Sequence, residues 1–247
     1  MMLCRTIHSE FWKMVTSRSM MLVVAAAVVC PVLLAGASGF AANSPVKVAV
    51  RNQGFETAGF GQPFIILLAS LNVYAEWSSG QIRTSLAATP DRKRLLAGKT
   101  IVSAMTASAI GLVATPMAVC LEQWARARSA GQCFTLIFTP EMLGNVLSVG
   151  LNYLLIALIA QSLTVITRSI VATIVVLVPM VLGFTIGLVP VFPILRFLPD
   201  LAGIQLLTGY PGLPLLSPLP GALVMAVWAI GMLAISVVLF NKRDIGG

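Results

Sequence analysis

The chain has 247 residues, of which 58% are hydrophobic and only 10% are charged, with a formal net charge of +8 and a mean hydropathy of +0.95. A soluble domain has about 25% charged residues, so the composition excludes a water-soluble globular protein and predicts an all-α, polytopic membrane protein. A membrane β-barrel is excluded too, because its strands alternate apolar and polar residues, whereas these apolar runs are continuous.

The first 19 residues predict an amphipathic helix at the membrane interface. Leu3, Ile7 and Phe11 recur at helical spacing, and polar residues such as Lys13 occupy the other faces. We expect Trp12 at headgroup depth. Such a helix either fixes the topology or contacts a partner, and the sequence leaves both open.

Six apolar runs follow, and each is a candidate membrane span because a spanning helix needs about 20 apolar residues. The second run is long enough only if its helix continues through Glu76. The first run is expected to be retained as a span, since its apolar stretch is longer than that of a signal peptide. The six candidates are roughly residues 20–42, 60–74, 101–121, 142–163, 170–189 and 222–240.

The basic residues predict the orientation of these spans. With six spans and the N-terminus inside, most of the 16 Lys and Arg residues fall on the cytoplasmic side, which agrees with the positive-inside rule. Both termini are therefore expected in the cytoplasm. Cys120 and Cys133 would then lie near the outer face, where a disulfide would survive, although unpaired thiols are the expectation for all four cysteines.

Residues 76–99 form a charged island between the second and third runs. A first helical piece would carry Ile82 and Leu86 on one face. Thr89 would cap a second helix, with Pro90 at its first position, and this helix would continue into the third span. The island is therefore predicted to be a folded cytoplasmic elbow and not a loose linker.

The island leads into Gly98-Lys99-Thr100, which matches the tail of a phosphate-binding P-loop. Such a loop also needs a glycine five residues before Gly98, and Lys93 stands there. No apolar strand precedes it. The sequence therefore predicts no nucleotide site in this chain, and any ATP would bind to a partner.

The fourth run carries a polar stripe. Asn145, Ser148 and Asn152 follow Glu141 at spacings that place them on one helix face. Because amides that face lipid are costly, the stripe must face protein or water. It either forms hydrogen bonds between helices or lines a translocation path.

Three features mark the C-terminal part of the chain. Gly183 and Gly187 form a GxxxG motif, which lets backbones approach closely and predicts a packing contact or a subunit interface. Residues 190–220 hold seven of the 14 prolines, so broken, re-entrant helices on the outer side are expected before the last span. Arg196 and Asp200 are a candidate ion pair at the outer mouth.

No catalytic or metal-binding pattern stands out. The single histidine, His8, precedes the first span, and the sequence has neither an HExxH nor a CxxC motif. The acidic residues fall at span ends or in loops, which gives a proton relay little support. We therefore expect neither an enzyme nor a metalloprotein.

The island "EWSSGQIRTSLAATPDRKRLLAGK" resembles the segment after the second span in permease subunits of type-2 ABC exporters. In members of that family this segment often contains, in order, an acidic residue, G-x-I-R-x-x-L, a T-P or similar turn, a basic residue and L-L-x-x-K. The flanks "SEFWKMVTSRS" and "FNKRD" are similar as well. The matching residues are Glu76, Gly80, Ile82, Arg83, Leu86, Thr89, Pro90, Arg92, Leu95, Leu96 and Lys99.

The resemblance implies a single transmembrane domain, residues 1–247, in a bacterial plasma membrane. The chain would pair with itself or with a sister permease along the first and fifth spans. The island would be the coupling helix that docks on a cytoplasmic ATP-binding subunit. The expected docking residues are Glu76, Ile82, Arg83, Leu86 and Arg92.

The resemblance also implies that ATP and magnesium bind to the partner ATPase, while this chain holds no cofactor, metal or nucleic acid. The expected cargo is a drug, a peptide antibiotic or a lipid, moved in export or in immunity. Two alternatives remain: a channel or secondary carrier that works without an ATPase, and a membrane anchor or sensor component that transports nothing.

Overall fold

The computed structural model describes residues 2–41, 55–78, 80–81, 91–137, 139–207 and 213–242. These residues form helices, turns and irregular segments, with no β-strand among them, so the all-α prediction is confirmed for this part of the chain. The predictions for Ile82, Arg83, Leu86, Thr89 and Pro90 lie outside the described residues.

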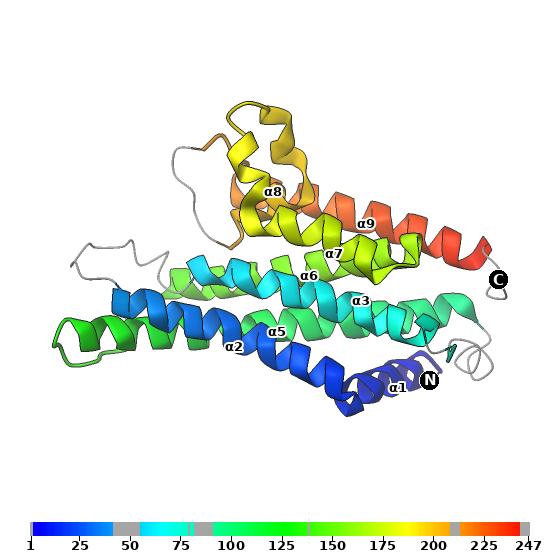
Figure 1. The fold of residues 1–247 in the computed structure, drawn as a ribbon, viewed down its shortest axis with the longest axis horizontal. Coiled ribbons are helices and arrows are strands. Elements are labelled where there is room, and N and C mark those ends of the chain that lie inside the picture. The colour runs from blue at the N-terminus through cyan, green and yellow to red at the C-terminus, as the bar shows by residue number, and fades with distance from the viewer. Residues whose placement is uncertain are drawn as a thin grey trace.

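Long helices account for most of the fold, and they lie side by side along the long axis of the molecule (Figure 1). Helix α1 and the end of α9 lie at the same end. The α-helices are α1 (Met2–Thr16), α2 (Arg18–Ala41), α3 (Gln62–Ser78), α5 (Arg92–Ser129), α6 (Pro140–Thr167), α7 (Ile170–Pro179), α8 (Pro199–Ile204) and α9 (Pro218–Lys242).

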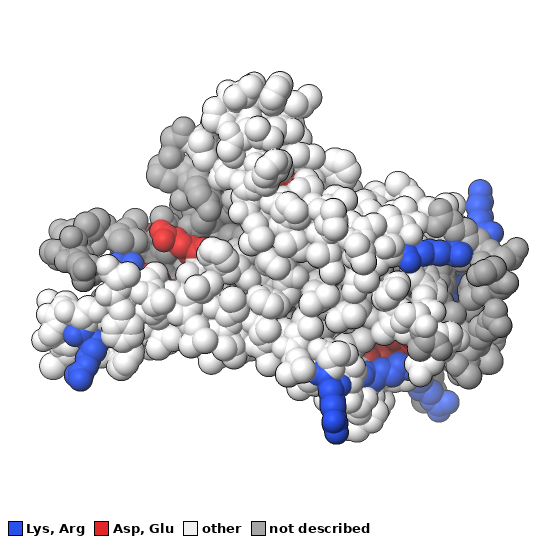
Figure 2. Space-filling view, in the orientation of Figure 1, with Lys and Arg blue, Asp and Glu red and all other residues white. Residues whose placement is uncertain are grey.

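Five segments of the described chain are helical, long and apolar enough to cross a membrane. They are α2, the 3₁₀ turn Glu56–Gly61 continued by α3, and helices α5, α6 and α9. On the face shown in Figure 2, most charged atoms of the described residues lie towards the two ends, and the band between them carries few charges. This distribution fits a bundle whose long axis crosses a bilayer.

Helix α6 is the centre of the bundle, because it packs against α5, α3 and α9, while α2 packs against α5 and α3. Its buried residues include Tyr153, Ile156 and Ile159, each with an exposed fraction of 1% or less. Gly111 of α5 and Gly150 of α6 mark the closest approach of those two helices, since a Cβ on Gly111 would lie 3.0 Å from the Cα of Gly150.

The fifth candidate span, residues 170–189, is not one long α-helix. Helix α7 ends at Pro179, a π-helical turn follows from Met180 to Phe184, and a 3₁₀ turn runs from Ile186 to Leu188. Two residues account for the break: Pro179 has no N–H to continue the helical ladder, and Gly183 has a φ of +97°, in the left-handed region that favours glycine.

The third span begins earlier than its apolar run, and its cap differs from the predicted one. Asp91, not Thr89, is the N-cap of α5, and its side chain accepts hydrogen bonds from the backbone N–H groups of Lys93 and Arg94. An acidic cap also suits the positive end of the helix dipole. From there α5 continues without interruption to Ser129, so the basic residues of the island and the third span share one helix, as expected.

Between residues 190 and 207 the proline-rich region is broken into short helices, as predicted, whereas residues 218–220 already belong to α9. The 3₁₀ turn Pro193–Phe197 and the six-residue α8 are separated by Leu198, and each begins with a proline in its first turn. Both stand beside the main bundle, above α7 in Figure 1. Residues 208–212 of this region lie outside the described part of the chain.

Candidate functional site

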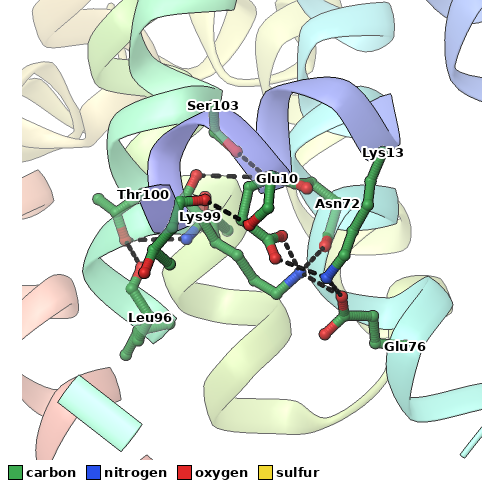
Figure 3. A network of polar contacts seen from close by, with 11 residues as sticks. Glu10, Lys13, Asn72, Glu76, Leu96, Lys99, Thr100 and Ser103 are labelled. Atoms are coloured by element: carbon green, nitrogen blue, oxygen red, sulfur yellow. Dashed lines mark hydrogen bonds and ion pairs between the residues drawn. The ribbon is translucent and has the colours of Figure 1, made fainter. Parts of the chain in front are cut away.

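Four alternating charges form a closed ring at the end of the molecule that carries α1. Lys13 donates to Glu10 Oε1 at 2.7 Å and to Glu76 Oε1 at 2.8 Å. The Nζ of Lys99 lies 2.6 Å from Glu10 Oε2 and 3.0 Å from Glu76 Oε1. Figure 3 shows the four side chains converging from three helices: Glu10 and Lys13 from α1, Glu76 from α3 and Lys99 from α5. We call this set the charge ring.

Three of the four ring side chains are shielded from solvent. Their exposed fractions are 1% for Glu10, 5% for Lys99 and 8% for Glu76, whereas Lys13 is 48% exposed. Removing a charge from water costs several kcal/mol, and a partner at hydrogen-bond distance must offset that cost. The two lysines and two carboxylates balance in charge and offset much of this cost, although Glu76 Oε2 is buried without a hydrogen-bond partner among the described residues.

Backbone and amide groups extend the ring into a joint between α3 and α5. Lys99 also donates to the carbonyl oxygen of Asn72 at 3.0 Å. The Asn72 side chain in turn donates to Ser103 Oγ at 2.8 Å and to the Lys99 carbonyl at 3.2 Å. Each helix therefore both donates and accepts, which fixes the register of one against the other.

The tripeptide Gly98-Lys99-Thr100 has a structural role that has nothing to do with phosphate. Gly98 lets α1 approach, because a Cβ there would lie 2.8 Å from Thr6 Cγ2. Lys99 belongs to the charge ring, and Thr100 accepts a 2.9 Å hydrogen bond from Gln161 of α6. Since all three residues lie inside α5, no loop can wrap a phosphate here.

Lys13 lies on α1, outside the spans, and is the exposed member of the ring. Burial lowers the pKa of Lys13, but hydrogen bonds to Glu10 and Glu76, together with the charges of both carboxylates, outweigh that effect and raise its pKa above the ordinary value. The ammonium is therefore charged at neutral pH and keeps its place between the two carboxylates.

The predicted docking residues are only partly described. Glu76 is buried and its Oε1 accepts from both lysines of the ring, so this carboxylate points into the protein. Arg92 is the first residue of α5 and is half-buried. The remaining three, Ile82, Arg83 and Leu86, lie outside the described residues.

The polar stripe of α6 separates into different environments. Asn152 is fully buried, accepts from Gln62 Nε2 at 2.8 Å and donates to the Gly203 carbonyl at 2.9 Å, which joins α6 to α3 and α8. Ser148 is partly exposed and donates to the Gly144 carbonyl of its own helix. Asn145 is half-buried, and Glu141 is exposed. At Asn152 the structure therefore shows hydrogen bonding between helices.

Gly183 and Gly187 do not form a packing motif in the described chain. Gly183 lies in the π-helical turn with left-handed backbone, and Gly187 lies in the following 3₁₀ turn, so they do not share the face of one α-helix. A Cβ on Gly187 would meet no atom within 4 Å. Gly183 is explained by its φ of +97°.

Two smaller expectations have different outcomes. The carboxylate of Asp200 accepts a hydrogen bond from Thr185 of the broken α7 segment, and the Arg196 guanidinium lies 4.9 Å from the centre of the Phe197 ring, so the expected Arg196–Asp200 pair is replaced by other contacts.

All four cysteines are free, as expected. Among the described residues, no cluster of three or more His, Cys, Asp or Glu side chains could hold a metal ion.

Sequence reasoning missed Glu10. A usable signal existed, because Thr6, Glu10 and Met14 follow one another at intervals of four residues and therefore share a helix face. All three are buried, with exposed fractions of 7%, 1% and 2%. A carboxylate between two packed neighbours requires a cationic partner. The pattern indicates that need, but not which of the 16 basic residues fulfils it.

Comparison of the sequence with models of known protein families and with curated proteins found no match.

Proposed function

We propose that this protein is the transmembrane subunit of an ATP-driven exporter of the type-2 ABC kind. The observation that carries the proposal is the contact between Glu76 and Lys99, the first and last residues of the segment that resembles the coupling region of that family. Their charged atoms lie 3.0 Å apart, so the segment starts and finishes at one place. Helices α3 and α5, which flank the segment, are thus joined at its base, and such an anchored base suits docking.

The topology proposed for the chain has six crossings with both termini in the cytoplasm of a bacterium. Five crossings correspond to the five long apolar segments, and α7 with its broken continuation would complete the sixth. The common end of α1 and α9 supports an even number of crossings (Figure 1). The short helices between residues 190 and 207 would be re-entrant on the outer side, where irregular backbone needs protein or water around it.

In this proposal, the chain moves cargo and does not hydrolyse ATP. Residues 79–91 and their flanking turns would dock on a cytoplasmic ATP-binding subunit, which would bind ATP and magnesium. Closure of two such subunits would tilt a pair of permeases and expose the path between them alternately to each side. The cargo class that fits is a hydrophobic or amphipathic molecule such as a drug, a peptide antibiotic or a lipid.

The test is pull-down of an ATPase by the tagged full chain, combined with cargo-stimulated ATP hydrolysis in nanodiscs. We expect Leu86→Asp to release the ATPase or to abolish stimulation, because an apolar anchor in a groove carries much of the binding energy. Gln132→Asp is the matched control, since it places the same carboxylate at an exposed position beyond the opposite end of α5, away from the elbow.

Three results would count against the proposal. Full coupling in Leu86→Asp would remove the docking role of the island. Transport by the purified chain without any ATPase would favour a channel or a secondary carrier. Stable binding of a partner with no transport of any cargo would favour an anchor or sensor component.

A further inference from the structure

The charge ring connects α1 to the helices on both sides of residues 79–91. Glu76 lies in the last turn of α3, before this segment, and Lys99 lies in the second turn of α5, after it. Glu10 of α1 contacts Lys99 directly, and Lys13 of α1 contacts Glu76. Helix α1 is thus held at both ends of the elbow by charged contacts of 3.0 Å or less.

We propose that Glu10 and Lys99 are positioning residues that couple the interface helix α1 to the base of the elbow, which is formed by the last turn of α3 and the second turn of α5. The inference rests on the proposed function, because the elbow is the part that would receive motion from an ATPase. Movement of the elbow would then be transmitted to α1 at the membrane surface as well as to the spans that follow it.

Two features make this joint stiff. Glu10 uses both carboxylate oxygens, one for each lysine, and Glu76 Oε1 accepts from both lysines, so no contact can rotate independently of the others. The close approach of α1 to α5 at Gly98, where a Cβ would lie 2.8 Å from Thr6 Cγ2, fixes the spacing of the two helices next to Lys99. A displaced α1 would carry Glu10 and Lys13 away together and leave Lys99 with Glu76 and the Asn72 carbonyl, so each buried charge would lose one of its partners.

The other buried carboxylate of α5 provides a matched control. Glu122 is 5% exposed and pairs with Arg126 one turn later on the same helix. This pair lies towards the opposite end of α5 from Lys99. Because Arg126 belongs to the same helix as Glu122, this contact does not couple α5 to α1, although the burial of Glu122 resembles that of the ring.

The experiment compares Glu10→Gln, Lys99→Met, the double variant Glu10→Gln/Lys99→Met and Glu122→Gln in full-length protein in nanodiscs. The first readout is tryptic cleavage after Lys93 and Arg94, both exposed in the first turn of α5. The second is melting temperature, and the third is the amount of cargo moved per ATP hydrolysed. Each single ring variant should lower the melting temperature and increase cleavage about ten-fold, since cleavage tracks the population of the open form.

The double variant separates positioning from charge balance. It leaves the neutral Lys13–Glu76 pair, so we expect the melting temperature to recover towards that of the wild type. Cleavage should remain about ten-fold faster, and cargo moved per ATP should remain low, because α1 no longer contacts α5 through the ring. Recovery of cleavage and coupling together with melting temperature would overturn the inference. Equal acceleration of cleavage in Glu122→Gln would overturn it too.

Failure of the proposed function would look different. The cleavage and melting measurements need no ATPase, so they test the joint even if no ATPase binds the wild-type chain. In that case the export proposal fails, and slow cleavage of the wild type with fast cleavage of the double variant still supports the coupling of α1 to the base of α5.

Discussion

The ammonium of Lys99 in α5 lies 2.6 Å from the carboxylate of Glu10 in α1, and the two residues are 89 positions apart in the sequence. Both side chains are almost fully buried. Breaking a buried pair by removing one partner is more costly than the pair is stabilising, because the remaining charge has no water to solvate it. This contact therefore governs the attachment of the N-terminal helix.

Lys99→Met should destabilise the folded protein by about 3–5 kcal/mol, because two buried carboxylates would share the single remaining cation, Lys13. Thermal unfolding in nanodiscs measures the loss. Lys93→Met, at an exposed site in the same helix, is the control, and equal stability of the two variants would contradict the importance of the ring.

Gly98→Ala should force α1 away from α5. The added Cβ would lie 2.8 Å from Thr6 Cγ2, closer than side chains tolerate, and overpacking of this kind costs about 1–3 kcal/mol. Gly144→Ala in α6 is the control, because a Cβ there meets no atom within 4 Å and alanine is the better helix former. A Gly98→Ala protein that melts no lower than Gly144→Ala would show that α1 packs more loosely than described.

Asn152→Leu should lower stability. The change removes hydrogen bonds to Gln62 and Gly203, each worth about 0.6–2 kcal/mol in a membrane protein, and leaves their buried polar groups without this partner. Ser148→Ala should cost little, since Ser148 bonds only within its own helix. If Asn152→Leu instead alters cargo preference at unchanged melting temperature, Asn152 lines the path.

Gly187→Leu tests self-association through the broken α7 segment. The structure makes Gly183→Leu unsuitable, because any side chain at φ +97° is strained. At Gly187 there is open space within the monomer, so leucine should be tolerated, and weaker association would indicate close packing against a second permease. Unchanged association of the purified variant in detergent would place any dimer contact elsewhere.

The contribution of Lys13 to the stability of the folded protein should change with pH in the alkaline range. Its pKa is raised on folding above the ordinary value of 10.5, so its stabilisation is complete below that pH and is lost as pH rises through the folded pKa. Because the side chain is 48% exposed, solvent screening limits the effect to about 1 kcal/mol or less. The melting-temperature difference between wild type and Lys13→Met should be constant near neutral pH and shrink above pH 10.5. A difference that already disappears about one pH unit or more below 10.5 would contradict the sign.

The sequence by itself determined the membrane class, the positions of the five long apolar helices and the absence of a P-loop. Hydropathy, helical periodicity and the absence of the first P-loop glycine at Lys93 are local properties of the sequence, so no tertiary contact was needed to interpret them. The same holds for the broken helices between residues 190 and 207, because proline removes a backbone donor wherever it stands.

Only the tertiary structure decided the partners of the buried polar residues. Glu10 finds Lys99, and Asn152 finds Gln62 and Gly203, across separations of 51 to 90 residues. The tertiary structure also decided that Gly98 allows the close approach of α1 to α5 and that Gly183 allows a turn with left-handed backbone. The sequence can indicate that a buried polar group needs a partner. The identity of the partner depends on which helices pack together, and the summed contacts of the whole bundle decide that packing.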